Sequence, residues 1–491
     1  MAELRNRIYI IGAGNTGETI AAEIRRKGVY GSVVAFLDDD ASKVGFALDG
    51  IPVLGPIEAV IQLLRSTPAD EAIIALPSAP TSEIRRIYEL LRRAMFARIR
   101  IVPGISQVLE ERPHLVQARE IAPEDLLKRT PRTVSLRETL RYVKGKRVLI
   151  TGAGGSIGSE LSRQLLSGGA ERLYLMGHGE NSIYQIHQEL QVLQDAGVGV
   201  PGALVPIVGE LQDRVYVEHI VTRLGADVVF HAAAHKHVPL TEANPVEAVK
   251  NNVFGTQNIV DACLSAGVGR LVLISTDKAV DPICVYGASK LLAEEVVLHQ
   301  ASAGHDFLVV RFGNVLASRG SFMPLFRRQI ANGGPVTVTH RAARRYLMTI
   351  PEAASLVLKA AGAGAGGELY LLDMGEPQSI LELAEDMIRF YGYRPYDDIP
   401  IQFVGLRPGD KLVERLWRDG EEPQPTDNPG ILSLRRSYSL NGHLAPLLHR
   451  LQMVCYGSPE CQGSYRNRRA LRTLLHEAVP TLEVPIAEPE Y

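Results

Sequence analysis

Residues 147–158, RVLITGAGGSIG, decide the fold of this chain. The first five, with the apolar residues Val148, Leu149 and Ile150 at their centre, are typical of a buried parallel strand. Gly152, Gly155 and Gly158 then recur at every third position, before a helical pattern at residues 160–166. Glycine permits a tight turn and lets a phosphate approach the start of the helix closely. The stretch therefore predicts a strand, a phosphate-binding turn and a helix of a doubly wound α/β sheet.

A second unit of this kind stands at the start of the chain. An apolar run precedes Gly12, Gly14 and Gly17, and a later apolar run ends at Asp38. An acid about 20 residues beyond such glycines is the usual ribose contact. The unit predicts a second Rossmann-like fold, which either binds a nucleotide as a regulatory ligand or is a structural domain with no ligand.

Composition limits the function classes. The chain has 491 residues, enough for two to four domains of roughly 150 residues. Lys and Arg number 53 against 55 Asp and Glu, so nucleic acid is not expected as a partner. Four scattered cysteines indicate a reduced, cytoplasmic protein rather than a disulfide scaffold. We see no apolar run long enough to span a bilayer.

Polar residues follow a later strand. The apolar run at 271–274 ends in Ser275, Thr276, Asp277 and Lys278, and polar residues at such strand ends face the ligand crevice. Beyond them, residues 286–290 read YGASK. Positions four apart share a helix face, so Lys290 lies beside Tyr286 and favours its phenolate. After a glycine turn and a strand-end Thr, this pair marks a short-chain dehydrogenase/reductase fold.

Several ordered stretches carry a family resemblance up to about residue 430. They are TGAGGSIGSE at 151–160, HKHVP at 235–239, STDKA at 275–279, RFGNVL at 311–316 and GLRPGDK at 405–411. The chain resembles the UDP-N-acetylglucosamine 4,6-dehydratases of bacterial polysaccharide biosynthesis, in the long form with an extra N-terminal nucleotide-fold domain. The resemblance implies two Rossmann-like doubly wound parallel sheets, the second an extended short-chain dehydrogenase/reductase domain.

The resemblance also implies a set of site residues. Cofactor contacts are expected at Gly152, Gly155, Ser156, Ile157, Gly158, Glu210, Leu211, Ala232, Ala233, Asn252, Tyr286 and Lys290. Substrate contacts are expected at Lys236, His237, Asn314, Arg319, Arg345, Arg407 and Asp410. The guanidinium groups suit a diphosphate because they donate paired, charge-assisted hydrogen bonds. No metal is expected, because His235 and His237 have no converging carboxylate or Cys set.

The chain departs from the family pattern in four respects. Gly177 ends a strand at a position where an acidic residue often accepts hydrogen bonds from the adenosine ribose. Without that acid, discrimination against the 2′-phosphate of NADP is weakened. No arginine adjacent in sequence is present to bind such a phosphate. We therefore expect NAD rather than NADP, tightly bound. Asp410 stands where the family usually has Glu, and Tyr286 is present where some relatives have Met. Many relatives carry N-terminal membrane helices, which we do not see here.

The predicted organisation has four segments. They are a nucleotide-fold domain at 1–108, a linker at 109–143, the catalytic domain at 144–430 and a C-terminal tail at 431–491. A homo-oligomer is expected, plausibly a dimer, because relatives of this fold usually pair. The tail carries no chemistry that we identify.

The expected reaction converts UDP-N-acetylglucosamine to its 4-keto-6-deoxy derivative. Tyr286 takes the proton from the C4 hydroxyl, Lys278 acts as the base at C5 and Asp277 as the acid at O6, although the last two roles are interchangeable. A basic Lys278 requires surroundings that depress its pKa, and an acidic Asp277 requires a raised one. A UDP-sugar 4-epimerase and a non-catalytic nucleotide-sugar sensor are the alternatives; Asp277 and Lys278 argue against the first, and the intact Thr276, Tyr286 and Lys290 set against the second.

Overall fold

The computed structural model divides the chain into two compact units, Met1–Arg137 and Glu138–Tyr491. It describes residues 6–28, 31–102, 119–120, 139–301, 305–437, 443–457 and 464–485. Of the linker expected at 109–143, all but residues 119–120 and 139–143 lie outside the described residues.

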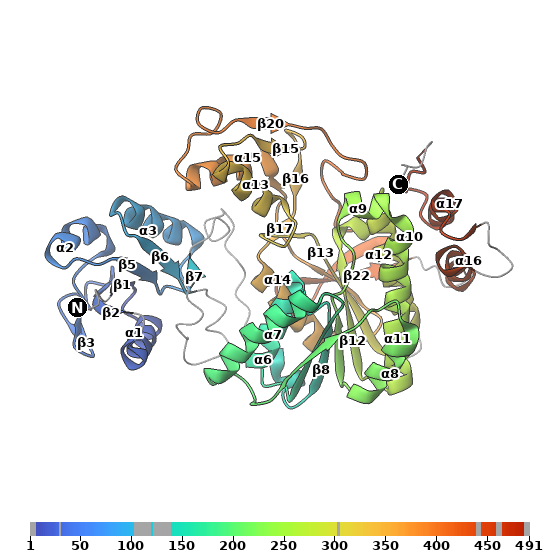
Figure 1. Ribbon diagram of the computed structural model, residues 1–491, viewed down its shortest axis with the longest axis horizontal. Helices are drawn as coiled ribbons and strands as arrows, with labels where there is room; N and C mark the ends of the chain where they lie inside the picture. Colours follow the sequence, from blue (N-terminus) through green and yellow to red (C-terminus); the bar gives the residue numbers. More distant parts are fainter. Residues whose placement is uncertain are drawn as a thin grey trace. The chain divides into compact units, whose positions relative to one another are not determined.

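The first unit is a five-stranded sheet flanked by helices (Figure 1). The strand order is β2-β1-β5-β6-β7, and all pairs are parallel except β6 with β7. The sheet strands are β1 Arg7–Ile11, β2 Ser32–Leu37, β5 Glu71–Ile74, β6 Arg98–Ile101 and β7 Arg119–Glu120. The remaining elements are α1 Asn15–Lys27, β3 Ala47–Leu48, β4 Ile51–Pro52, η1 Ile57–Ala59, α2 Val60–Ser66 and α3 Thr81–Arg93.

The second unit contains a nine-stranded sheet in the order β10-β9-β8-β11-β12-β13-β18-β22-β21. Its strands are β8 Arg147–Thr151, β9 Arg172–Gly177, β10 Leu204–Val208, β11 Val228–His231, β12 Arg270–Thr276, β13 Asp306–Phe312, β18 Leu369–Leu372, β21 Glu421–Pro425 and β22 Ile431–Arg436. The first seven in the order are parallel, and β22 and β21 add an antiparallel edge. The prediction of two doubly wound parallel sheets is confirmed, with antiparallel strands at one edge of each.

Helices cover both faces of this sheet (Figure 1). They are η4 Leu140–Val143, α6 Ser156–Ser167, α7 Glu180–Asp195, α8 Arg214–Leu224, α9 Val238–Ala243, α10 Pro245–Val249, the π-helix η5 Lys250–Phe254, α11 Gly255–Ala266, η6 Asp277–Ala279, α12 Val285–Ala301 and α14 Ile350–Ala363. Two further helices, α16 Leu444–Tyr456 and α17 Arg468–Ala478, follow β22. Strand β22, which lies between β18 and the edge strand β21, and both these helices thus belong to the segment beyond residue 430.

A smaller lobe is inserted after β13 (Figure 1). It contains α13 Phe322–Ala331, α15 Ile380–Phe390 and three two-stranded sheets. The paired strands are β14 Asn314–Val315 with β17 Leu347–Met348, β15 Val336–Val338 with β20 Ile401–Phe403, and β16 Arg344–Arg345 with β19 Gln378–Ser379. Among the described residues of both units, no helix is both long and apolar enough to cross a membrane.

Candidate functional site

The glycine turn between β8 and α6 leaves no room for side chains. Gly152 has a φ of +69°, and a Cβ there would lie 2.7 Å from the backbone nitrogen of Ala233. A Cβ on Gly158 would collide with the carbonyl oxygen of Gly152. Gly155 precedes the helix, and no side chain caps the first N–H groups of α6. The turn is therefore shaped as a cradle for a phosphate group.

A buried hydrogen-bonded chain fixes the strand ends beneath this turn. Thr256 Oγ1 donates to the carbonyl of Asn252 (2.7 Å), so it accepts from His231 Nε2 at 2.9 Å. His231 Nδ1 is then the acceptor for Thr151 Oγ1 at 2.6 Å. Burial, aided by the charge of Lys290, lowers the pKa of His231 to about 3. His231 is thus a neutral side chain that links its own strand β11 to β8 and α11 through hydrogen bonds.

A cavity of about 540 Å³ opens beside the turn at the carboxyl ends of the strands. The sequence-predicted residues that line it are Gly155, Ser156, Ile157, Gly158, Ala232, Lys236, His237, Thr276, Lys278, Tyr286, Lys290, Asn314 and Arg319. Residues from the glycine turn, from β12, from α12 and from the segment after β13 therefore meet around one space. This is the ligand crevice expected of an open α/β sheet.

The other predicted residues do not line the cavity. Asn252 is buried and clamps the backbone of His235 from both sides, with bonds of 2.8 and 2.9 Å. Leu211 packs in the core beneath β9 and β10. Gly152 and Ala233 meet through backbone, as described above, and Glu210 is exposed.

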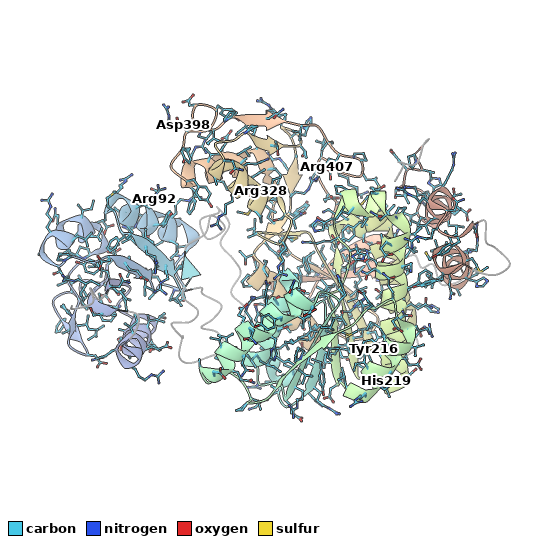
Figure 2. All side chains as sticks on the ribbon, in the orientation of Figure 1. Arg92, Tyr216, His219, Arg328, Asp398 and Arg407 are labelled. Atoms are coloured by element: carbon cyan, nitrogen blue, oxygen red, sulfur yellow. The ribbon has the colours of Figure 1, made fainter. Side chains whose placement is uncertain are left out.

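Three predicted substrate residues lie on the segment beyond β14. Arg345 Nη1 donates to the carbonyls of Arg344 and Leu412. Arg407 and Asp410 pair with each other at 2.9 Å, and Arg407 projects outward from the chain after β20 (Figure 2). The structure therefore brings none of these three to the cavity wall itself.

Tyr286 sits in the first turn of α12, buried at the cavity wall. Burial raises its pKa to about 12, while the charge of Lys278 and a hydrogen bond from Thr276 oppose the rise. Lys290 Nζ donates to the carbonyl of Ile274 at 2.8 Å, and burial lowers its pKa to about 8. The leading charge acting on the phenol is thus Lys278, rather than the Lys290 that the Tyr-x-x-x-Lys spacing singles out.

Lys278 lies between two carboxylates at the end of β12. Its Nζ is 3.1 Å from Asp277 Oδ1 and 3.4 Å from Glu414 Oε1. Burial opposes the charge, but the two carboxylates outweigh it and raise the pKa of Lys278. The expectation of a depressed lysine pKa is therefore wrong: Lys278 is an ammonium, because two anions face it within ion-pairing distance.

Asp277 is completely buried behind Lys278, and burial raises its pKa in the direction that the sequence analysis requires. Its Oδ1 accepts from Thr276 and Lys278, whereas Oδ2 has no hydrogen-bond partner. A Cβ on Gly313, which lines the cavity, would lie 2.7 Å from that Oδ2. Gly313 therefore packs directly against this unpaired, buried oxygen, and a side chain there would collide with it.

Glu414 was not found from the sequence. It is buried, at 4% exposed, and also lies 3.6 Å from Lys411, whose Nζ donates to the carbonyl of Val280. The signal available was its place three residues after the GLRPGDK stretch, on a segment far from residue 278 in sequence. This segment returns to the site and supplies a second anion.

Basic side chains also line the cavity, and one of them contacts the glycine turn. Arg319 Nη1 donates to the carbonyl of Gly154 at 2.6 Å, and its backbone nitrogen donates to Ser156. Burial and the charge of Lys278 lower the pKa of Lys236, and burial and Lys236 lower that of His237. The mutual repulsion of these groups favours an anionic ligand next to the glycine turn.

The glycine turn of the first unit is built differently. Asp38 Oδ2 accepts from the backbone of Ala13 at 2.7 Å and pairs with Lys43 at 3.2 Å. Gly12 has a φ of +106° and Gly17 packs on its carbonyl, but a Cβ on Gly14 would meet nothing within 4 Å. The turn is thus open at Gly14, while Asp38 is already engaged by the protein.

Residues 148–436, which contain this cavity, match a family model described as polysaccharide biosynthesis protein. The chain belongs to this family. Residues 1–103 separately match a model described as a CoA-binding domain. The predicted family resemblance is confirmed.

Proteins similar to this chain bear different names. A probable polysaccharide biosynthesis protein of Bacillus subtilis, EpsC, is 42% identical over 418 residues, covering 85% of this chain and 69% of that protein. An inverting UDP-N-acetylglucosamine 4,6-dehydratase of Campylobacter jejuni is 32% identical, covering 55% and 77%. A UDP-glucose 4-epimerase of Rickettsia typhi is 40% identical, covering 39% and 56%.

A solved structure supports the fold. Pen from Bacillus thuringiensis is 31% identical, with a TM-score of 0.54, covering 61% of this chain and 89% of that chain. The likeness concerns the architecture of the catalytic unit.

Proposed function

We propose that this protein removes water from UDP-N-acetylglucosamine to form the 4-keto-6-deoxy sugar nucleotide. The observation that carries the proposal is that Lys278 and Tyr286 line one cavity, with the buried Asp277 paired to Lys278 directly behind the cavity wall. Epimerisation at C4 needs one group that exchanges the hydroxyl proton, whereas dehydration needs two further groups, at C5 and O6. The relative named as a UDP-N-acetylglucosamine 4,6-dehydratase supports this substrate.

The residues fit a tightly bound nicotinamide dinucleotide. The side-chain-free turn at Gly152, Gly155 and Gly158 suits its pyrophosphate, and Tyr286 and Lys290 suit its nicotinamide end. When bound, such a cofactor would supply reversible hydride transfer, out of C4 and back to C6. Gly177 ends β9 without an acid, and no arginine adjoins it, so we propose NAD over NADP. Nucleotide extracted from denatured protein tests this choice, and NADP alone would reverse it.

Tyr286 and Thr276 handle the proton of the C4 hydroxyl. The Thr276 hydroxyl bonds both the phenol and the Asp277 carboxylate. Because a hydroxyl carries one proton, it donates to only one of these groups at a time. A proton shift at Tyr286 is thereby coupled to the charge on Asp277.

The proton roles at C5 and O6 follow from the resting charges. Lys278 is an ammonium that lines the cavity, so it is the group able to donate a proton to the departing O6. Asp277 carries the unpaired, buried Oδ2 and a raised pKa, which makes its carboxylate a stronger base for the C5 proton. We therefore propose the reverse of the expected assignment: Asp277 as base and Lys278 as acid.

This assignment balances protons when the C4 hydroxyl proton is included. Asp277 gains the proton from C5 as Lys278 loses one to O6, water leaves, and the C5–C6 double bond forms. When hydride is returned to C6, Asp277 gives its proton back to C5, and the proton taken from the C4 hydroxyl restores the ammonium of Lys278, whose Nζ lies 3.1 Å from Asp277 Oδ1. Such a pair titrates as a unit rather than as two separate residues.

One assay decides among the functions. The purified protein is incubated with UDP-N-acetylglucosamine and with UDP-glucose. The products are separated by chromatography, and their masses are measured by mass spectrometry. Loss of one water supports the proposal. A product that is an isomer of unchanged mass would identify a 4-epimerase, the activity in the name of the Rickettsia relative. Recovery of both substrates unchanged would favour the non-catalytic nucleotide-sugar sensor.

A further inference from the structure

The last two helices cover the back of the catalytic helix. α16, α17 and residues 479–485, here the C-terminal hairpin, lie beyond the residues 148–436 that match the family. Figure 1 shows both helices beside α10, and α10 in turn lies beside α12. The hairpin thus joins the catalytic unit on the side away from the smaller lobe.

The contact is a continuous apolar core. One face of α12 contributes Val285, Ala288, Leu291 and Leu292, and all four are buried in one cluster with the hairpin. The hairpin's members of that cluster are Leu447, Leu451, Val454, Cys455, Leu471, Leu474, Leu475, Val479 and Leu482. α12 is buried on every side over Val285–Leu298, so each of its faces needs a packing partner. The hairpin supplies that partner opposite the cavity.

A buried ion pair connects the hairpin to the start of α12. Glu242, on α9, accepts from the backbone nitrogen of Val285 through Oε1 at 2.6 Å. Its Oε2 accepts from Arg472 Nη1 at 2.7 Å, and Arg472 Nη2 donates to the Glu242 carbonyl at 2.7 Å. Arg472 is 1% exposed. The carboxylate that holds the first amide of α12 is therefore itself held by α17.

Another contact fixes the loop that joins the two catalytic elements. Thr481 Oγ1 donates to the carbonyl of Pro282 at 2.8 Å, between Lys278 and Tyr286 in sequence. A Cβ on Gly287 would collide with the Lys278 carbonyl and lie 2.8 Å from the Pro282 side chain. Loop and helix are packed tightly, so movement of either changes the separation of Lys278 and Tyr286.

We propose that the C-terminal hairpin sets the position of Tyr286 relative to Lys278, with Arg472 as a positioning residue that acts through Glu242. The inference rests on the proposed function for its kinetic readout. A displacement of about 1 Å in a catalytic group can lower a rate by about a hundredfold. Because the predicted substrate contacts Arg319 and Asn314 lie on other elements, we expect the loss to fall mainly on kcat rather than on KM.

The test compares Arg472→Gln with a matched control, Arg450→Gln, in the full-length protein. Arg450 pairs with Glu477 between the same two helices, and both side chains are exposed. We expect Arg472→Gln to lower kcat by about tenfold or more with KM within about twofold, and Arg450→Gln to change neither. Equal losses in both variants, or an unchanged kcat in Arg472→Gln, would overturn the proposal.

Amide hydrogen exchange gives a readout that does not need the reaction. Exchange over residues 282–292 is expected to rise in Arg472→Gln and in Thr481→Val, and to stay at the wild-type level in Arg450→Gln. Thr481→Val keeps the side-chain shape and removes one hydrogen bond, so it remains informative if Arg472→Gln fails to fold. If the wild type releases no dehydrated product, the proposed function fails. Hydrogen exchange at wild-type rates in both Arg472→Gln and Thr481→Val independently overturns the proposed role of the C-terminal hairpin.

Discussion

At the scale of single residues, the chemistry of the site depends on which anion faces which cation. Lys278 lies between Asp277 and Glu414, and these two carboxylates keep it positively charged. A role as the C5 base would require the neutral amine. Residue type and spacing identified the pair. They did not identify Glu414, because its partner lies 136 positions earlier in the chain, as the numbering 414 and 278 gives. Ionisation is set by such long-range neighbours, which a local motif does not contain.

The roles at C5 and O6 are separable by isotope exchange. With UDP-N-acetylglucosamine in D₂O, Asp277→Asn should lose deuterium incorporation at C5, because the amide cannot act as the base. Lys278→Gln should retain that exchange yet release at least about a hundredfold less dehydrated product, because it cannot protonate O6. Mass spectrometry of recovered substrate measures both. Exchange that survives in Asp277→Asn and disappears in Lys278→Gln would restore the original assignment.

Removing Glu414 should change the alkaline side of the pH profile. The carboxylates raise the folded pKa of Lys278 above its unfolded value, so their stabilisation is complete below the unfolded pKa and is lost as pH rises through the folded pKa. Glu414→Gln removes one of two anions, and the alkaline limb of kcat/KM should move to lower pH. The exposed Glu422 serves for a control, Glu422→Gln, whose limb should not move. A limb unmoved in Glu414→Gln would contradict the ion pair's role.

At the scale of elements, the strands and glycine turns were predictable from the sequence, whereas the side-chain hydrogen bonds that connect these elements were not. The apolar run at β8 and the glycines after it identify strand, turn and helix through local sterics alone. In contrast, His231 reads as the last residue of a strand, and its bonds to Thr151 and Thr256 arise only when β8, β11 and α11 come together. The same holds for Asn252, expected at the cofactor and found clamping His235.

The neutral, buried His231 predicts a specific sensitivity to acid. Its folded pKa of about 3 lies below the ordinary value of 6.5, so the unfolded chain binds a proton that the folded chain refuses. Stability is therefore lost as pH falls from 6.5 toward 3, by about 2 kcal/mol at pH 5. Urea unfolding of the wild type and of His231→Gln at pH 7 and pH 5 measures the difference. We expect the variant to be less stable at pH 7 but to lose less free energy of unfolding between pH 7 and pH 5. An equal loss in both proteins would contradict a neutral, buried His231.

At the scale of the whole molecule, the chain contains two nucleotide folds with different turns. In the catalytic unit the turn meets a cavity, and Arg319 closes on its backbone. In the first unit Asp38 bonds Ala13 and Lys43, which indicates a turn stabilised by its own protein. The C-terminal segment was expected to be a tail without chemistry. It supplies β22 to the sheet and two helices behind α12, because apolar surface on those elements needs cover that local pattern does not reveal.

The remaining question is whether the first unit binds a ligand, and the open position at Gly14 allows a direct test. If a nucleotide or nucleotide sugar binds at this turn, Gly14→Trp should abolish that binding while turnover by the catalytic unit stays within about twofold of wild type, because a Cβ at this position meets no protein atom within 4 Å. Calorimetric titration of both proteins with UDP-N-acetylglucosamine, UDP and coenzyme A counts the sites. One site fewer in the variant supports a regulatory ligand. Identical titrations would make the unit structural, in keeping with an Asp38 whose side chain already pairs with Lys43 and accepts from Ala13.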